Sequence, residues 1–490
     1  MRLDQLTPKA LDDAAMAATQ IFGLTADSRA VQPGYLFAAL SGSAADGRAY
    51  VGQAIDNGAA AILTDAPMVV GVPVLASDNP RRDLAHMAAQ FFEHQPAHIG
   101  AITGTNGKTS TAAFLRQLLA AAGFNVASMG TLGVEAEGYF EPLAHTTPDP
   151  VRLHAALRDL VAHQITHVAM EASSHGLAQY RLDGIKLAVA GFTNLTRDHL
   201  DYHATTQDYA LAKQRLFTDI LADDGIAVIV MTHDAGVAMA DAAQAAGRQV
   251  LPVGREGDGV HVAITARSAI GLTLAITLNG AQVQLDVPLI GDFQTENLAL
   301  ALGMAQAFGV DDARLIEACR MVNAPRGRMQ YVGRTRVGAA VYVDYAHTPD
   351  ALENALTALR AHAPHNGQLA VMFGCGGERD AGKRSQMGLV AAQHADTVYV
   401  TDDNPRHEDA AAIRAAIMAS CPAAHEIADR RVAIETAMAD VAAGDIVLLA
   451  GKGHETGQII GDMVLPFDDA LVAQSFISAV EGAPKGGQHD

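Results

Sequence analysis

The sequence has few cysteines, no excess of positive charge and no long uninterrupted apolar run. Its 490 residues include three cysteines, Cys319, Cys375 and Cys421, which are too widely spaced to indicate a disulfide framework or a paired-cysteine zinc site. Asp and Glu number 54 against 34 Lys and Arg, a formal charge of −20, which argues against a general attraction to nucleic acid. We expect a protein of a reducing compartment, in which any anionic ligand meets a local positive site.

Signals for secretion or for a membrane span are also lacking. The first residues, MRLDQLTPKALDD, are polar, and the apolar stretch at 59–74 is interrupted by Asp65, Pro67 and Pro73. We therefore expect no membrane span and a cytoplasmic location. A monomer is also expected, although nothing in the sequence reveals the oligomeric state.

A chain of this length exceeds what one hydrophobic core supports, so two or three domains are expected. Strand-like apolar runs alternate with helical patterns in three sections, with joins near residues 97 and 328. The expected domains are 1–97, a small α/β domain; 98–328, built on a largely parallel sheet; and 329–490, a second doubly wound sheet. The fold class is α/β, and ligands should bind beyond the carboxyl ends of the strands.

The predicted strands are short apolar runs bounded by turn residues. They lie at 35–40, 59–64 and 72–76 in the first section, at 98–103, 167–171, 187–193 and 226–231 in the second, and at 340–345, 369–373, 397–400 and 445–450 in the third. Residues 260–287 alternate like an antiparallel ribbon.

A glycine-bearing loop lies between the predicted strand at 98–103 and a helical pattern at 111–122. It consists of Gly104, Thr105, Asn106, Gly107, Lys108, Thr109 and Ser110. In this order of strand, turn and helix, backbone N–H groups can hold phosphate oxygens, Lys108 can neutralise charge and Thr109 can offer its hydroxyl to magnesium. The full Walker pattern has Gly where this chain has Ile102. The loop predicts ATP or GTP binding, but it does not distinguish an enzyme from a nucleotide-controlled switch.

The loop and a series of later motifs resemble the Mur ligases. The motifs follow the family's order: TTP at 146–148, EASSHGL at 171–177, TNL at 193–195, RDHLDYH at 197–203, GDF at 291–293, GRM at 327–329, VDYAHTPDAL at 343–352, DNPR at 403–406 and GKGHE at 451–455. They span all three sections. The chain is most similar to the members that add the third peptide residue, in the diaminopimelate-using form.

The resemblance implies an ATP-dependent ligase of peptidoglycan synthesis. It implies an N-terminal uridine-binding domain, a central P-loop ATPase domain and a C-terminal Rossmann-like domain that holds the amino acid. The implied substrates are UDP-MurNAc-L-Ala-D-Glu, meso-2,6-diaminopimelate and ATP, with Mg²⁺ as the cofactor. The carboxylate of D-Glu would take the γ-phosphate to form an acyl phosphate, which an amine then attacks. Such phosphoryl transfer needs positioning and positive charge more than a protein nucleophile.

The resemblance also implies catalytic and metal-binding residues. The implied catalytic residues are Lys108, Glu171, His199 and Lys213. Thr109 and Glu171 would hold one magnesium ion, and Glu171, His199 and a carbamylated Lys213 would support a second. A bare ammonium at Lys213 would be repelled by magnesium, whereas N6-carboxylysine supplies oxygen. From the residues alone, Lys213 could equally be a solvated helix lysine and His199 a structural or surface histidine.

Three ligand sites are implied in the same way. For the nucleotide-sugar dipeptide they are Ser28, Ser43, Ala44, Ala45, Thr146, Thr147, Ser173, Gln179 and Arg181; for the adenine end of ATP, Asn297, Arg328, Asp344 and His347; for diaminopimelate, Arg379, Asp403, Asn404, Pro405, Arg406, Gly451 and Glu455. Without the family, the residues for the sugar and peptide arm read as scattered surface positions.

The tetrapeptide DNPR occurs twice, at 78–81 and at 403–406. The second copy follows a predicted Rossmann-type strand, whereas the first is expected to be a turn that enters a helix at 81–92. The guanidinium of Arg406 suits a ligand with an extra carboxylate, which favours diaminopimelate over lysine. A ligase that adds lysine, or glutamate to folate, stays an alternative, as does a nucleotide-controlled binding protein without ligase chemistry.

Overall fold

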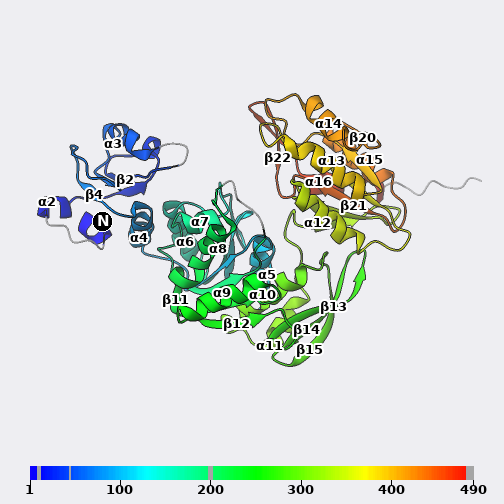
Figure 1. The fold of residues 1–490 in the computed structure, drawn as a ribbon, viewed down its shortest axis with the longest axis horizontal. Helices are drawn as coiled ribbons and strands as arrows, with labels where there is room; N and C mark the ends of the chain where they lie inside the picture. The colour runs from blue at the N-terminus through cyan, green and yellow to red at the C-terminus, as the bar shows by residue number, and fades with distance from the viewer. Residues whose placement is uncertain (8–12, 43–45, 197–201, 482–490) are drawn as a thin grey trace, which may run out of the picture. The chain divides into compact units, whose positions relative to one another are not determined.

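The computed structural model describes residues 1–7, 13–42, 46–196 and 202–481. These form two compact units, one of Met1–Val260 with Ala299–Leu315 and the other of His261–Leu298 with the chain from Ile316 onward. The chain passes from one unit to the other within or next to β13 (Val260–Ser268), α10 (Gln294–Ala307) and α11 (Asp312–Cys319). Figure 1 labels most of the elements. The expected domain boundaries near residues 97 and 328 stay a prediction.

The first unit begins with a four-stranded parallel sheet in the order β1-β2-β3-β4. Its strands are β1 (Gly23–Thr25), β2 (Tyr35–Ala39), β3 (Ala61–Thr64) and β4 (Val74–Ala76), and its helices are α1 (Leu3–Leu6), α2 (Ala14–Ala17), α3 (Val51–Asp56) and α4 (Pro80–Phe92), with short 3₁₀ turns at Ser28–Ala30 and Gly47–Tyr50. Successive residues of β2 enter two different cores, one on each face of the sheet. The three strands predicted in this section are confirmed, each one or two residues shorter than predicted.

The same unit contains a larger sheet in the order β12-β11-β10-β5-β9-β6-β7-β8, parallel from β12 to β6. Its strands are β5 (His98–Thr103), β6 (Val126–Gly130), β7 (Gly133–Ala136), β8 (Tyr139–Glu141), β9 (His167–Glu171), β10 (Leu187–Phe192), β11 (Leu221–Val230) and β12 (Gln249–Val253). Its helices include α5 (Lys108–Ala121), α6 (Pro150–Ala162), α7 (Ser174–Ala178), α8 (Thr206–Arg215) and α9 (Asp234–Ala245), with a π-helical turn at Leu216–Ile220. Strands β10, β5 and β9 are neighbours, so their carboxyl ends meet at one edge.

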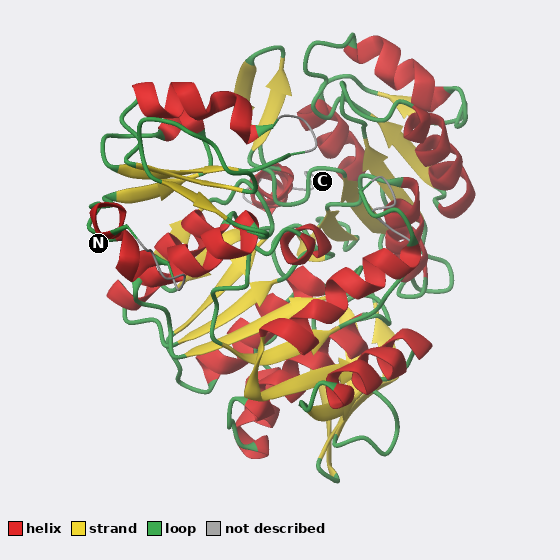
Figure 2. Cartoon of the chain, turned by 60° about the vertical axis from the view of Figure 1, so that its left-hand side comes forward, coloured by secondary structure: helices red, strands yellow, loops and turns green. Residues whose placement is uncertain are grey.

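The second unit contains a six-stranded sheet in the order β16-β17-β21-β18-β19-β20, parallel except for β16. Its strands are β16 (Gln330–Arg334), β17 (Ala340–Asp344), β18 (Leu369–Phe373), β19 (Thr397–Val400), β20 (His425–Glu426) and β21 (Ile446–Ala450). Its helices are α12 (Pro349–Arg360), α13 (Gly382–His394), α14 (Ala410–Met418), α15 (Arg430–Ala439) and α16 (Asp469–Glu481). Figure 2 shows the helices of the chain in red and its strands in yellow.

Alternate residues of the second unit's strands enter two separate cores. In β17, Tyr342 packs into one core, whereas Val341 and Val343 pack into the other. Such alternation, with both sets buried, requires helices on both faces of the sheet. The predicted second doubly wound sheet is confirmed. The predicted ribbon is confirmed as β13 followed by an antiparallel pair, β14 (Gly271–Leu278) and β15 (Ala281–Val287).

Local signals set the starts of several helices. Helix α6 begins with Asp149, whose carboxylate accepts hydrogen bonds from the amides of Val151 and Arg152, followed by Pro150 at the first helical position. Helix α12 begins in the same way with Thr348 and a proline. A short polar cap followed by proline is a strong helix start because both satisfy or remove the free first-turn donors. Among the described helices, none has both the length and the apolar character to cross a bilayer.

Candidate active site

The predicted phosphate loop connects the carboxyl end of β5 to the amino end of α5. Two glycines in it have positive φ, Gly104 at 150° and Gly107 at 86°, and Gly107 is the residue before the helix. A Cβ atom at Gly104 would collide with the hydroxyl of Thr193. Gly104 therefore requires glycine because the loop passes close to the end of β10, and Gly107 favours glycine because its backbone is left-handed.

The end of β10 holds this loop in place. The backbone carbonyl of Asn194 accepts a hydrogen bond from the amide of Thr105 (2.9 Å), and its side-chain oxygen accepts one from the amide of Asn106 (3.0 Å). The hydroxyl of Thr193 donates to the carbonyl of Asn106 at 2.6 Å. The sequence TNL at 193–195 is thus a support of the phosphate loop, a role that sequence reasoning did not assign.

Lys108 lies over the loop. Its ammonium donates to the carbonyls of Gly104 (3.0 Å) and Thr105 (2.8 Å). Ser110, in the first turn of α5, is buried. A positive side chain and a helix amino terminus at the same loop make a site for phosphate oxygens.

Glu171, the last residue of β9, faces the first turn of α5. The hydroxyl of Thr109 donates to its carboxylate, 3.0 Å from each oxygen, and the amide of Thr131 donates at 2.8 Å. Glu171 is 3% exposed. The structure brings together the two predicted ligands of the first magnesium ion, and their oxygen donors fit that metal. Thr131 was missed because nothing in the sequence links it to residue 171.

Lys213 is buried, at 1% exposed, so the alternative of a solvated helix lysine is wrong. Its ammonium donates to the carbonyl of Gly104 at 2.7 Å and lies 4.2 Å from the centre of the Tyr209 ring. The hydroxyl of Tyr209 in turn donates to that of Thr105 at 3.2 Å. Helix α8 therefore delivers Lys213 to the phosphate loop.

His199 lies outside the described residues, as do Ser43, Ala44 and Ala45. In the part of the chain that is described, no group of three or more His, Cys, Asp or Glu side chains is arranged to hold a metal. The predicted second magnesium ion therefore stays a prediction.

The residues predicted for the sugar and peptide arm are not scattered. The hydroxyl of Thr147 donates to the carbonyl of Glu171 (3.0 Å) and accepts from the amide of Ser173 (3.0 Å). Arg181 donates to the carbonyl of Thr147 and, at 2.8 Å, to the side chain of Gln179. Burial lowers the pKa of Arg181.

Thr146 and Ser28 complete the described part of this set. The hydroxyl of Thr146 lies 3.1 Å from that of Thr131, which also contacts Glu171. Ser28, in the first sheet domain, donates to the side chain of Gln53 at 2.8 Å. Thr146, Thr147, Ser173, Gln179 and Arg181 therefore form one network at the end of β9, whereas Ser28 lies apart from it.

The residues predicted for the adenine end lie in the second unit. The carboxylate of Asp344, at the end of β17, accepts hydrogen bonds from the amides of Met329 (2.7 Å) and Ala346 (2.8 Å). Burial raises the pKa of this carboxyl, although the nearby Arg328 and the two amides act to lower it. The guanidinium of Arg328 lies 4.8 Å from the centre of the Tyr345 ring.

His347 and Asn297 were predicted for the same end of ATP. His347 packs its ring against that of Tyr345, 4.5 Å between centres, and burial lowers its pKa. Asn297, on α10, is 4% exposed and donates to the side chain of Gln294 at 3.0 Å. Arg328, Asp344 and His347 thus share one cluster around Tyr345.

The predicted diaminopimelate loop, Asp403 to Arg406, follows β19 in the same unit. Asn404 donates to Glu455 (2.9 Å) and accepts from the amide of Ile459 (2.9 Å). Arg406 has a positive φ of 53°, and its Nη1 donates to the carbonyl of Gly377 at 2.7 Å.

The loop packs against two glycines of the segment that follows β18. A Cβ atom at Gly374 would collide with the carbonyl of Thr401, and one at Gly377 with that of Pro405. Sequence reasoning missed this segment, although its run of glycines after a strand was a usable signal. Arg379, at its end, is exposed.

The two DNPR copies have different structures. In the first, Asn79 caps α4 by accepting a hydrogen bond from the amide of Arg82, and Pro80 is the first helical residue. Arg81 donates to the carbonyl of Ser41 at 2.6 Å. The prediction of a turn entering a helix is confirmed. The second copy enters no helix but pairs with β22 (Gly457–Ile460), which forms a hairpin with β23 (Met463–Pro466).

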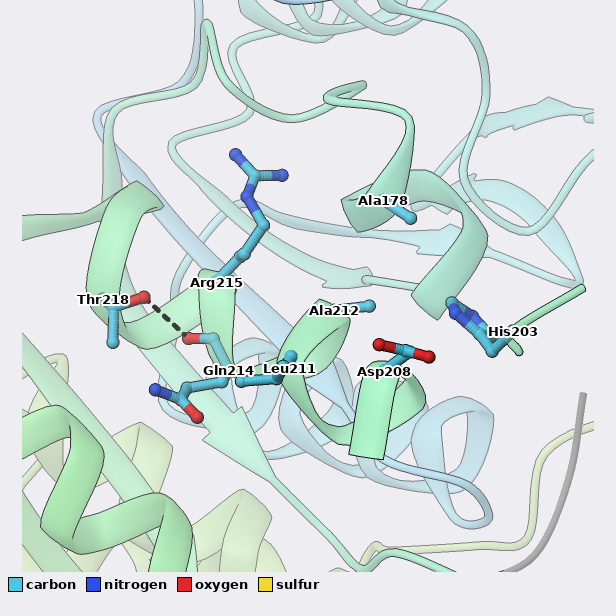
Figure 3. Close-up of a pocket in the computed structure, with 8 residues that line it drawn as sticks. All are labelled: Ala178, His203, Asp208, Leu211, Ala212, Gln214, Arg215 and Thr218. Atoms are coloured by element: carbon cyan, nitrogen blue, oxygen red, sulfur yellow. Dashed lines mark hydrogen bonds between the residues drawn. The ribbon is translucent and has the colours of Figure 1, made fainter. Parts of the chain in front are cut away.

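A pocket of about 430 Å³ lies beside helix α8 (Figure 3). It is lined by Ala178, His203, Asp208, Leu211, Ala212, Gln214, Arg215 and Thr218. Within its described lining there is no residue predicted for a ligand. One side of helix α8 therefore lines this pocket, and another side carries Lys213 to the phosphate loop.

Comparisons with known proteins agree with the motifs. Three models match the chain: the Mur ligase family, catalytic domain at residues 20–103, the Mur ligase middle domain at 102–305, and the Mur ligase, glutamate ligase domain at 327–453. A relative in Bradyrhizobium diazoefficiens, named UDP-N-acetylmuramoyl-L-alanyl-D-glutamate--2,6-diaminopimelate ligase, is 47% identical over 95% of this chain and 97% of its own length. The chain belongs to the Mur ligase family.

Two further Mur ligases extend this finding. A relative of the same name from Chelativorans sp. is 48% identical over 92% of this chain and 93% of its own length. A solved structure of a ligase of that name has 34% sequence identity and a TM-score of 0.74, and covers 99% of this chain and 100% of its own. The predicted family and the three-domain α/β fold of the Mur ligases are confirmed.

The first prediction concerns Lys108. Lys108→Ala should lower ATP turnover by roughly 100-fold or more, because it removes a preorganised charge at the transferred phosphate. Phosphate release gives the rate, and an unchanged unfolding midpoint shows that the fold survives. Lys186→Ala, at an exposed lysine of the same unit, is the matched control. Near-normal turnover of Lys108→Ala would remove the loop from the mechanism.

Proposed function

We propose that this chain is the ATP-dependent ligase that joins meso-2,6-diaminopimelate to UDP-MurNAc-L-Ala-D-Glu in the cytoplasmic stage of peptidoglycan synthesis. Its relatives named above are ligases with this reaction in their names. The observation that carries the substrate assignment is the loop at 403–406, in which Arg406 and Asp403 offer opposite charges on one loop beside Glu455. Such a pair of charges suits the second amino-acid head of diaminopimelate.

In this proposal the D-Glu carboxylate attacks the γ-phosphate of ATP and ADP leaves. Lys108 and the amides at the start of α5 hold the phosphate oxygens in line. The amine of diaminopimelate then attacks the acyl carbonyl, and phosphate leaves from the tetrahedral intermediate. Arg181, whose guanidinium is largely withdrawn from water, would pair with a phosphate or carboxylate of the nucleotide-sugar dipeptide.

Thr109 and Glu171 would hold magnesium, which when bound neutralises charge on the phosphates. We propose that Lys213 works as its carbamate, because its side chain reaches the same loop as these ligands and an ammonium there would oppose the metal. Electron density in a magnesium-nucleotide complex should extend beyond Nζ of Lys213. A side chain that ends at Nζ and points away from the loop would disprove this role.

At the amino-acid site, the described hydrogen bonds of Arg406 use its backbone and Nη1, which leaves Nε and Nη2 for a ligand. A guanidinium binds a carboxylate through two such nitrogens. Asp403 would accept from the ammonium of the same head, and Arg379, Gly451 and Glu455 would complete the pocket. L-lysine offers an ammonium at this end but no carboxylate, so it would leave Arg406 unpaired.

A coupled assay tests the function. Phosphate release from ATP with UDP-MurNAc-L-Ala-D-Glu should depend on meso-diaminopimelate, and the tripeptide product should appear in equal amount. Release that no amino acid stimulates would support a nucleotide-controlled binding protein instead. Equal stimulation by L-lysine would support a lysine-adding ligase.

The duplicated tetrapeptide gives a matched pair of variants. Arg406→Ala should lose kcat/KM for meso-diaminopimelate by about 100-fold or more, since a site built around a polar group depends strongly on its partner. Arg81→Ala, in the copy that begins α4, should leave the preference for meso-diaminopimelate over L-lysine unchanged. A larger effect of Arg81→Ala on this preference would show that the wrong copy had been assigned.

A further inference from the structure

The side chain of Lys452 is fully buried between the loop at 403–406 and the segment that leads to β22. Its ammonium donates to the side-chain oxygen of Asn404 (2.9 Å) and to the carbonyl of Gly457 (2.8 Å). It also lies 3.2 Å from a carboxylate oxygen of Asp403 and 3.7 Å from one of Glu455. Both carboxylates belong to the proposed amino-acid site.

A buried ammonium is costly unless opposite charges and acceptors surround it, and removing one partner from such a pair is strongly unfavourable. Lys452 is 0% exposed and Asp403 is 8% exposed. Within the described residues, the Oδ1 atom of Asp403 has no hydrogen-bond donor at good geometry, although Lys452 is close to it. The charge of Lys452 therefore compensates Asp403 mainly through electrostatic attraction.

Lys452 also contacts the residues that connect the loop at 403–406 to β22. Asn404 links the loop to β22 through the amide of Ile459, and Lys452 contacts both the side chain of Asn404 and the carbonyl of Gly457. The side chain of Gln458 donates to the carbonyl of Asp403 at 2.8 Å. The backbone of the loop is thus held by Gln458, and Lys452 contacts the side chains of Asp403 and Asn404.

We propose that Lys452 is a specificity-determining residue that acts through charge, without touching the substrate. This proposal rests on the proposed function. Asp403 and Glu455 bring two negative charges to the pocket, and Lys452 cancels one of them. The potential at Arg406 is then positive enough for a ligand carboxylate, while one negative charge is left for the ligand ammonium.

This arrangement predicts a change of preference when the charge count changes. The distal head of meso-diaminopimelate carries a carboxylate and an ammonium, whereas L-lysine carries the ammonium alone. Loss of the positive charge of Lys452 makes the pocket more negative, which opposes the carboxylate and not the ammonium. A more negative pocket should therefore lower the preference for diaminopimelate over lysine, so this preference measures the electrostatic potential in the pocket.

The experiment is a competition between meso-diaminopimelate and excess L-lysine in one reaction, with the two tripeptide products measured by mass spectrometry. Lys452→Met should lower the ratio of diaminopimelate product to lysine product by roughly tenfold or more. Glu455→Gln, which removes a negative charge, should raise the ratio. The double variant should lie between the two single variants.

Arg360→Met is the control for the loss of one positive charge from the protein as a whole. Arg360 ends helix α12 in the same unit and pairs with Asp396 at 2.8 Å, so its loss removes a positive charge at a place with no role in the site. The product ratio should stay at the wild-type value. A ratio that falls in this variant would mean that total charge, and not Lys452, determines the preference.

Two outcomes overturn the inference. If Lys452→Met lowers both products equally, the residue only supports the fold; if Glu455→Gln fails to raise the ratio, pocket charge does not set the preference. The second test holds even where Lys452→Met does not fold. Failure of the proposed function is distinct, because wild-type protein would then form no diaminopimelate product at all.

Discussion

Parallel strands bring their carboxyl ends to one edge of a sheet, and the phosphate site of the first unit and the proposed amino-acid site of the second unit each depend on this constraint. In the first unit, neighbouring strands β10, β5 and β9 end at Phe192, Thr103 and Glu171, so the phosphate loop is held between Thr193 on one side and Glu171 on the other. In the second unit, β17, β21, β18 and β19 place Asp344, Gly451, Gly374 and the loop at 403–406 at one edge. Residues far apart in sequence become partners without any local signal.

At these edges, backbone segments approach each other so closely that glycine is needed at two positions. Gly104 and Gly374 each leave no room for a side chain, because the next strand's loop passes directly over them. The same constraint separates the two DNPR copies. In the first copy, Asn79 caps the start of helix α4. In the second, Asn404 accepts a hydrogen bond from Ile459 of β22 and donates one to Glu455. One peptide thus takes two structures because its tertiary surroundings differ.

Many of the strands and the phosphate loop could be predicted from local patterns in the sequence. The strands at 98–103, 167–171, 369–373 and 397–400 have the bounds that their apolar runs indicate. The turn of the phosphate loop follows from its glycines, and helix α5 follows from the helical pattern after it. The roles of Thr131, Thr193 and Lys452 could not be predicted, because each depends on a partner that only the fold brings near. The burial of Lys213 is of the same kind: helical spacing alone does not say which side of α8 faces the sheet.

The central claim is that the loop at 403–406 reads the distal end of meso-diaminopimelate. A crystal structure of the protein with the UDP-MurNAc-tripeptide product bound would test it most directly. We predict the distal carboxylate within hydrogen-bond distance of two nitrogens of Arg406, the distal ammonium beside Asp403, and Lys452 still buried against Asn404. A tripeptide whose distal end lies away from Arg406, or contacts Arg81 instead, would contradict the account.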